Sequence, residues 1–256
     1  MILAVDIGNT HIVIGCIEDD KILSIDRLET DINKTEIEYA VMIKSILEFN
    51  KFDLGEFEGA VMSSVVPPIN SMIVRSIKKV INCDTLVVGT GIKTGLNILI
   101  DNPAQTGSDL VVAAVAAVSM YKTPIIIIDM GTATTMSAVT GKADFIGGAI
   151  IPGLGISMSA LTSNTSQLPK VSFEAPEKCI STNTIDCMKS GAVFGSAAMI
   201  DGMIDRFESE LGKGASIVAT GGISGSIIKH CKHEIVYEPD LLLRGLMIIY
   251  NKNKKK

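Results

Sequence analysis

Apolar and polar positions alternate at the start of the chain in a way that is typical of β-strands. The pattern predicts three strands, at residues 2–5, 11–17 and 22–28, with an acidic turn at Asp19 and Asp20 before the third. A capping box of Thr35 and Glu38 comes next, and apolar positions at near-helical spacing continue to about residue 50. The chain is therefore expected to open with a sheet followed by one amphipathic helix.

The next part of the chain alternates between strand and helix. An apolar strand at 60–66 is stopped by Pro67 and Pro68, and the pattern then predicts a helix at 69–80 and a short strand at 86–88. A run of small residues at 110–118 predicts a tightly packed, buried helix, which would suit a hinge between two halves. This alternation indicates an α/β protein.

The second half of the chain begins as the first half does. Residues 4–15 read A-V-D-I-G-N-T-H-I-V-I-G and residues 127–138 read I-I-D-M-G-T-A-T-T-M-S-A, so that Asp6 and Asp129 take equivalent places. Internal similarity of this kind implies two related sheets that face one another across a cleft. The remaining elements expected are a Gly- and Pro-rich turn at 147–155, a helix at 184–211, a strand at 216–219 and a helix at 241–250.

Composition excludes several classes of protein. Apolar residues make up 47% of the 256 residues and charged residues 20%, which is typical of a globular protein. The net charge is -5 and the basic residues cluster only at the extreme C-terminus, so we expect no nucleic-acid partner. The chain has no apolar run near the ~18 residues of a membrane span and no signal peptide at its start, so we expect a cytoplasmic protein without a membrane partner.

The five cysteines show no C-x-x-C pair, so neither a disulfide framework nor a zinc knuckle is indicated. His230, Cys231 and His233 lie close together, but one short cluster is weak evidence for a metal site.

The turn after the first strand carries candidate phosphate-binding chemistry. Gly8 lets the backbone approach a ligand, Asn9 and Thr10 supply short polar groups, and the Asp6 carboxylate could hold Mg²⁺ directly or through water. Alone, such a loop is also compatible with an ordinary tight hairpin. The second loop, which contains Asp129, Gly131 and Thr132, repeats the arrangement and favours a functional role for both.

Asp109 is the remaining candidate for chemistry. A carboxylate in a cleft could accept the proton of an attacking alcohol. An Asp near the start of a helix is equally suited to cap that helix, and spacing alone leaves both roles open. Neither a P-loop nor a G-x-G-x-x-G fingerprint occurs in the chain.

A third glycine-containing loop, T-G-G-I-S, begins at Thr220. The chain also contains, in order, D-I-G-N-T at Asp6, G-S-D at Gly107, D-M-G-T-A-T-T at Asp129, G-G-A-I-I-P-G-L at Gly147, L-P-K-V at Leu168, N-T-I-D-C-M-K-S-G at Asn183 and T-G-G at Thr220. Through these motifs the chain resembles the acetate-and-sugar-kinase, heat-shock-chaperone and actin superfamily, and within it the type III pantothenate kinases. The resemblance runs from Met1 to about Tyr250.

The resemblance implies two ribonuclease-H-like domains, at 1–118 and 119–256, a homodimer, and ATP-dependent phosphorylation of pantothenate in coenzyme A biosynthesis. It implies that Asp109 is the catalytic base and that Asp129 ligates a monovalent cation, K⁺ or NH₄⁺. The ATP phosphates, with Mg²⁺, would be bound by Asp6, Ile7, Gly8, Asn9, Thr10, His11, Ile12, Val13 and Thr132. Pantothenate would be bound by Gly107, Ser108, Asp109, Leu110 and Thr184.

Two positions depart from the family pattern. The family usually has G-A-D-R where this chain has Ser108 and Leu110 around Asp109, and R-T-x-x-L-P where it has Asn164. Loss of two arginines could weaken binding of an anionic substrate, because Leu and Asn cannot supply planar charged donors. The alternatives are therefore a kinase for another small alcohol and a nucleotide-binding regulatory protein without turnover.

Overall fold

The computed structural model describes residues 1–254, except for the side chain of Ala104, and these residues form two compact units. The first unit contains residues 1–95, 102–116 and the C-terminal segment from Leu241. The second unit contains residues 96–101 and 117–240. The chain thus passes between the units more than once, whereas the sequence analysis expects a single boundary, between residues 118 and 119. The assignment of domains at that boundary stays a prediction.

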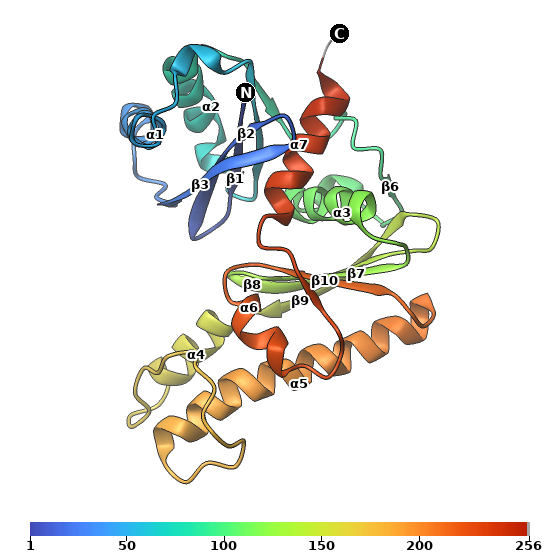
Figure 1. Cartoon of the computed structure of the whole chain (residues 1–256). Coiled ribbons are helices and arrows are strands. Elements are labelled where there is room, and N and C mark those ends of the chain that lie inside the picture. Colours follow the sequence, from blue (N-terminus) through green and yellow to red (C-terminus); the bar gives the residue numbers. More distant parts are fainter. Residues whose placement is uncertain (255–256) are drawn as a thin grey trace. The chain divides into compact units, whose positions relative to one another are not determined.

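The first unit is a five-stranded sheet with helices on both faces (Figure 1). Its strands follow the order β3-β2-β1-β4-β5, in which β1 is antiparallel to β2 and parallel to β4. The elements are β1 (Ile2–Ile7), β2 (His11–Glu18), β3 (Lys21–Glu29), α1 (Glu36–Phe49), η1 (Leu54–Glu56), β4 (Gly59–Ser64), α2 (Pro67–Ile81), β5 (Thr85–Val87), η2 (Pro103–Gln105), α3 (Ser108–Met120) and α7 (Leu241–Asn253).

The alternation of side chains along β1 assigns its two faces. Leu3, Val5 and Ile7 point into the core formed with α1 and α2. The intervening positions face the other side, where α7 packs on β1 and β4, with the Leu243 side chain directly above Gly15 of β2. Asp6 belongs to this second set, so its carboxylate lies on the face opposite the main core.

The second unit is a six-stranded sheet that repeats the first. Its order, β11-β10-β7-β8-β9-β6, contains β9-β8-β7-β10-β11 in the places of β3-β2-β1-β4-β5. The strand β7 is antiparallel to β8 and parallel to β10, as β1 is to β2 and β4. The elements are β6 (Asn97–Ile98), β7 (Ile125–Met130), β8 (Ala133–Val139), β9 (Asp144–Pro152), α4 (Leu154–Ser163), α5 (Thr184–Leu211), β10 (Ser216–Thr220), α6 (Ser224–Ile227), η3 (Ile228–His230) and β11 (Val236–Tyr237).

The long helix α5 lies along one face of this second sheet (Figure 1). Ile126, Ile128 and Met130 of β7 pack against its buried side chains, which include Val193 and Ile200. The duplication predicted from the sequence is therefore confirmed, and the fold class is α/β with two related sheets.

Most of the predicted elements are confirmed, and one prediction is wrong. Residues 147–155 do not form a turn: they are the second half of β9 and the start of α4. The glycines serve close packing within the sheet, because a Cβ on Gly148 would lie 1.9 Å from the carbonyl oxygen of Met136 on β8. Gly147 has a φ of 114°, and the pairing of β8 with β9 shifts register at this point. Along the described chain, no helix is long and apolar enough to cross a lipid bilayer.

Candidate active site

The first Asp-x-Gly hairpin joins β1 to β2 in the first unit. The side chains of Ile7 and Ile12 are buried in the core, so only their main-chain atoms could meet a nucleotide. Asn9, Thr10 and His11 are exposed at the turn, and Val13 is half-buried. The hairpin thus offers polar side chains and backbone groups at its tip, above an apolar base.

Two hydrogen-bonding residues hold the tip of this hairpin in place. The amide of Gly8 donates to the carbonyl oxygen of His11 at 3.0 Å, and a Cβ on Gly8 would lie only 3.2 Å from that oxygen. Thr30, just after β3, donates its hydroxyl to the Gly8 carbonyl at 2.7 Å and its amide to the Thr10 carbonyl at 3.0 Å. A braced, glycine-containing turn of this kind suits the close approach of phosphate oxygens.

Asp6 is a buried carboxylate with one hydrogen-bonded oxygen. Its Oδ1 accepts a hydrogen bond of 2.5 Å from the hydroxyl of Ser63, and Asp6 as a whole is 8% exposed. Burial raises the pKa of the Asp6 carboxyl to about 6; the Ser63 hydrogen bond lowers this pKa and the charge of Asp109 raises it. Oδ2 accepts no hydrogen bond from the described residues, so it is available to a cation or its water shell. This oxygen fits the Mg²⁺ that accompanies ATP.

Asp109 lies in the same unit, at the start of α3. Burial raises the pKa of its half-buried carboxyl above the usual range, and the amide of Leu110, which donates to Oδ1 at 2.9 Å, lowers it. A Cβ on Gly107 would lie 2.3 Å from that same oxygen, so the glycine makes room for the carboxylate. The neighbouring Ser108 is bonded to the main chain of Ser64, at the end of β4. The charge of Asp109 also contributes to the raised pKa of Asp6, and both residues belong to the first unit.

The second Asp-x-Gly hairpin, in the second unit, has the same construction. The amide of Gly131 donates to the carbonyl oxygen of Ala133 at 3.0 Å, as that of Gly8 does to His11. Thr132 is exposed at the tip, and Asp129 is half-buried. Gly221 has a φ of 95°, and a Cβ there would lie 2.6 Å from both Asp129 Oδ1 and the Met130 carbonyl oxygen. Both oxygen atoms therefore lie against the backbone of Gly221, at a position where a side chain would clash with them.

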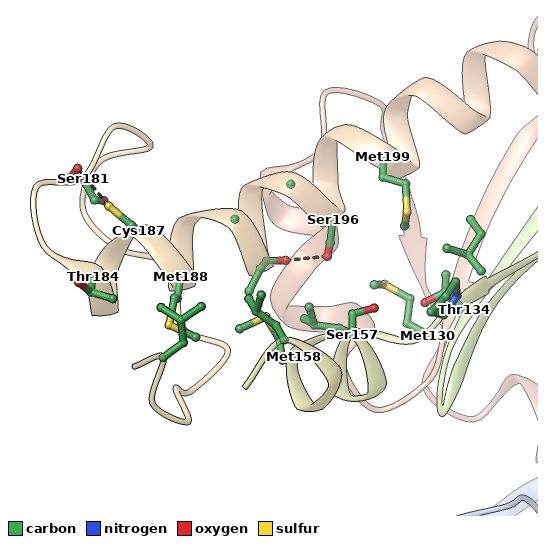
Figure 2. Close-up of a pocket in the computed structure, with 18 of the residues that line it drawn as sticks. Met130, Thr134, Ser157, Met158, Ser181, Thr184, Cys187, Met188, Ser196 and Met199 are labelled. Carbon is green, nitrogen blue, oxygen red and sulfur yellow. Dashed lines mark hydrogen bonds between the residues drawn. The ribbon is translucent and has the colours of Figure 1, made fainter. Parts of the chain in front are cut away.

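Thr184 begins α5 and lines a cavity of about 920 Å³ in the second unit (Figure 2). The N-cap Asn183 accepts a hydrogen bond from the amide of Asp186 at 2.9 Å, which holds the first turn of the helix. The cavity runs along α5 from this turn towards Met130 and Thr134 at the second hairpin. Its lining is mainly methionine, leucine and small residues.

The sites predicted from the sequence are thus distributed over both units. The first unit brings the residues at 6–13 together with those at 107–110, and the second unit holds Asp129, Thr132 and Thr184. Leu110 is half-buried beside Asp109, and Asn164 is an exposed C-cap residue of α4. Sequence reasoning missed Thr30 and Ser63. The signal for Ser63 was a pair of polar residues, Ser63 and Ser64, at the end of an otherwise apolar strand and before Val65.

The side chains of His230 and His233 contact different partners. His230 packs edge-on against Phe194, with ring centroids 5.2 Å apart, and His233 Nε2 lies 2.9 Å from Asp205 Oδ1. Burial raises the pKa of the Cys231 thiol to about 12. Over the described residues, no three His, Cys, Asp or Glu side chains are grouped to hold a metal ion.

Comparison with known proteins identifies the family. The family model described as type III pantothenate kinase matches residues 2–206. The chain is 38% identical over 253 residues to a type III pantothenate kinase of Bacillus cytotoxicus, covering 99% of this chain and 97% of that protein. It is 39% identical over 253 residues to one of Halalkalibacterium halodurans, covering 99% and 100%.

The fold is also similar to that of a solved kinase. A ROK family glucokinase from Streptomyces griseus, in complex with glucose and AMPPNP, matches with a TM-score of 0.54 and 13% identity over 97% of each chain. This likeness concerns the fold, and the sequence matches carry the assignment. The chain belongs to the type III pantothenate kinase family.

Proposed function

We propose that this protein transfers the terminal phosphoryl group of ATP to the primary hydroxyl of pantothenate, which forms 4'-phosphopantothenate and ADP in coenzyme A biosynthesis. The observation that carries the proposal is the presence of a buried carboxylate, Asp6, and a half-buried one, Asp109, in one unit of a chain that belongs to the type III pantothenate kinase family. One carboxylate suits proton transfer and the other suits the cation that accompanies ATP.

In the proposed reaction, Asp109 accepts the proton of the pantothenate hydroxyl while the oxygen attacks the terminal phosphorus of ATP. The new P–O bond forms as the bond to the bridging oxygen of ADP breaks, and that oxygen leaves with its electron pair. The hairpin of residues 6–13 would bind the phosphate chain, and Thr132 is assigned the same role. Asp6 would hold Mg²⁺, which would neutralise charge on the phosphates. Positioning and electrostatics supply most of the rate, and the base contributes about 10²- to 10⁴-fold.

The residues proposed to bind pantothenate lie beside the base and at the start of α5. They are Gly107, Ser108, Asp109, Leu110 and Thr184. Half-burial of Asp109 supports this role because an alcohol bound there would be shielded from water.

We also assign a monovalent cation, K⁺ or NH₄⁺, to Asp129. The support is the convergence of Asp129 Oδ1 and the Met130 carbonyl oxygen beside Gly221. Hard oxygen ligands of this kind prefer such cations to soft metals.

A homodimer acting in the cytoplasm completes the proposal. The second unit exposes several isoleucines, of which Ile150 is 76% and Ile180 is 88% exposed. A second copy of the chain would remove such apolar surface from water.

The test is a coupled assay of ADP release with pantothenate, ATP, Mg²⁺ and K⁺, run on the native protein and on Asp109→Asn. We expect pantothenate-dependent turnover that falls by at least about 10²-fold in the variant. Asp53→Asn is the matched control, because Asp53 is an exposed cap of η1 and the amide can still accept the hydrogen bond of Gly55. Turnover unchanged by Asp109→Asn would leave Asp109 as a helix cap.

A kinase for another small alcohol is the second candidate, and Leu110 is the observation that favours it. An apolar side chain beside the base removes a cationic group that would pair with an anionic substrate. A screen of uncharged alcohols in the same assay would separate the two activities. Nucleotide binding without turnover on any alcohol would instead indicate a regulatory protein.

A further inference from the structure

Two adjacent residues at the end of β4 contact Asp6 and Ser108, the residue that precedes Asp109. Ser63 bonds to Asp6 through its side chain, and Ser64 bonds to Ser108 through its main chain. We propose that the hydroxyls of Ser63 and Ser108 are positioning groups that hold these two carboxylates in one rigid frame. The inference rests on the proposed phosphotransfer function and assigns to Ser108 a contact with the protein itself.

Ser63 is placed by strand pairing. It is the partner of Asp6 in the parallel register of β1 and β4, and it is fully buried. Its hydroxyl donates to Asp6 Oδ1 at 2.5 Å. With Oδ1 held from the neighbouring strand, the rotation of the carboxylate is restricted and Oδ2 keeps a fixed direction. An Ala at position 63 would remove this hydrogen bond, and the Asp6 carboxylate would then be free to rotate.

Ser108 is placed by a two-way contact with β4. Its hydroxyl oxygen accepts a hydrogen bond from the Ser64 amide at 2.9 Å and donates one to the Ser64 carbonyl oxygen at 3.0 Å. A serine at the first position of a helix usually caps that helix, but both of these bonds are directed to the end of the strand. They tie the start of α3, and so the adjacent Asp109, to the strand that carries Ser63.

The rest of β4 makes the frame stiff. The Val65 amide donates to the Ile7 carbonyl at 3.0 Å, and the Val66 amide donates to the Ser64 hydroxyl at 3.0 Å. The main chain after β4 is thus bonded to β1, to α3 and to itself within a few residues. Catalysis that depends on two positioned carboxylates is sensitive to small displacements of these groups, since a displacement of about 1 Å can lower the rate roughly 10²-fold.

The experiment compares Ser63→Ala, Ser108→Ala and the double variant with Ser76→Ala as control. Ser76 is fully buried in the same unit, and its hydroxyl lies within hydrogen-bonding distance of two carbonyl oxygens, that of Glu36 at 2.7 Å and that of Met72 at 2.8 Å. Each single variant loses one hydrogen-bonded hydroxyl, fully buried at Ser63 and Ser76 and half-buried at Ser108, so shifts of the unfolding midpoint in the same direction are expected. Two quantities are measured: kcat and KM for pantothenate, and the affinity for ATP with and without Mg²⁺ by calorimetry.

We expect each of the two site variants to lower kcat roughly 10- to 100-fold, with little change in KM for pantothenate in Ser63→Ala. Ser76→Ala should change neither kcat nor KM. The double variant should lose less than the product of the single losses, because the two hydroxyls serve one frame. Ser63→Ala should also reduce the gain in ATP affinity that Mg²⁺ provides. Ser108→Thr, which keeps the hydroxyl, should retain most of the activity.

Other outcomes overturn the inference. Unchanged kcat and unchanged Mg²⁺-dependent ATP affinity in both site variants would do so, as would losses equal to those of Ser76→Ala. If Ser63→Ala does not fold, Ser63→Cys keeps nearly the same volume with a much weaker donor and replaces it. A native protein that binds ATP with Mg²⁺ but never phosphorylates pantothenate would refute the proposed function alone, because the calorimetric comparison would still decide the role of Ser63.

Discussion

At the scale of single residues, the first unit buries a carboxylate whose charge has few compensating groups. The pKa of Asp6 lies at about 6 mainly because burial removes water from around the ionised form, and the single hydrogen bond from Ser63 offsets only part of this effect. Burial also raises the pKa of the Asp109 carboxyl. Such carboxylates weaken the folded state at neutral pH, and perturbed groups of this kind concentrate at functional sites.

The raised pKa of Asp6 predicts a pH dependence of stability in the metal-free protein. The folded-state value, about 6, exceeds the ordinary value of 3.8, so the folded state binds the proton more tightly. Stability from this group is fully present below about pH 4 and is lost as the pH rises through 6, by up to roughly 3 kcal/mol. The prediction is checked by urea unfolding of the native protein and of Asp6→Asn at several pH values across this pH range. If the free energies of unfolding of the two proteins change with pH in parallel, the prediction is contradicted.

Gly107 predicts a second effect at this scale. A Cβ there would lie 2.3 Å from Asp109 Oδ1, so Gly107→Ala must displace the carboxylate that we propose as the catalytic base. We expect kcat to fall roughly 10- to 100-fold with little loss of stability, because a flexible side chain yields and the backbone stays in place. Gly89→Ala, where a Cβ would meet nothing within 4 Å, is the control and should behave like the native protein. Equal kcat for both variants would show that the carboxylate tolerates the shift.

Leu110 predicts a gain of substrate affinity. Leu110→Arg would restore the guanidinium of the family pattern beside Asp109, and a charged hydrogen bond to an anionic substrate contributes about 1.5–3 kcal/mol. We expect KM for pantothenate to fall about tenfold or more. Leu110→Lys, with a single point charge, should recover less. A KM that stays the same in both variants would indicate that the carboxylate of pantothenate binds elsewhere.

At the scale of elements, helix starts differ in what they support. The helices α1 and α5 both begin at a capped position: Thr35 and Glu38 form a reciprocal capping box, and Asn183 accepts the Asp186 amide. The first turn of α5 carries Thr184, whereas the first turn of α1 carries no proposed site residue. The two caps therefore allow the structural and functional effects of a helix start to be separated.

Replacement of the two caps is expected to have the same effect on stability but different effects on KM for pantothenate. Asn183→Ala and Thr35→Ala should each lower the free energy of unfolding by about 1 kcal/mol, since each removes a cap. Only Asn183→Ala should raise KM for pantothenate, because fraying of the first turn of α5 displaces Thr184. Chemical denaturation and steady-state kinetics on the same samples measure both effects, and a raised KM in Thr35→Ala would mean that general destabilisation is responsible.

At the scale of the whole molecule, the exposed apolar residues of the second unit bear on assembly. Ile150 of β9 is 76% exposed and Ile185 of α5 is 49% exposed. We predict that the native protein sediments as a dimer and that Ile150→Asp shifts it towards the monomer, because a carboxylate cannot be buried unpaired at an interface. Phe49→Asp, at a 90% exposed position of the first unit, is the control and should stay dimeric. Dissociation by both variants, or by neither, would contradict this choice of interface.

The sequence by itself determined the features that depend on neighbours in the chain. Periodicity located α1, α2, α5 and α7, the Thr35 cap, and the repeated hairpins of Asp6 and Asp129, because these rest on local side-chain alternation and turn chemistry. The family motifs located Asp109. Roles for these residues remain the subject of the experiments above.

Only the tertiary structure decided the features that depend on contacts distant in sequence. It placed β9 across a predicted turn, since the glycines there are required by the close approach of β8, and it grouped α7 with the first unit. It also paired Ser63 with Asp6 and Ser64 with Ser108, although 57 and 44 residues separate them. Local patterns carry no information on which distant strands pair, and it is this pairing that places Ser63 beside Asp6 and the end of β4 beside the start of α3.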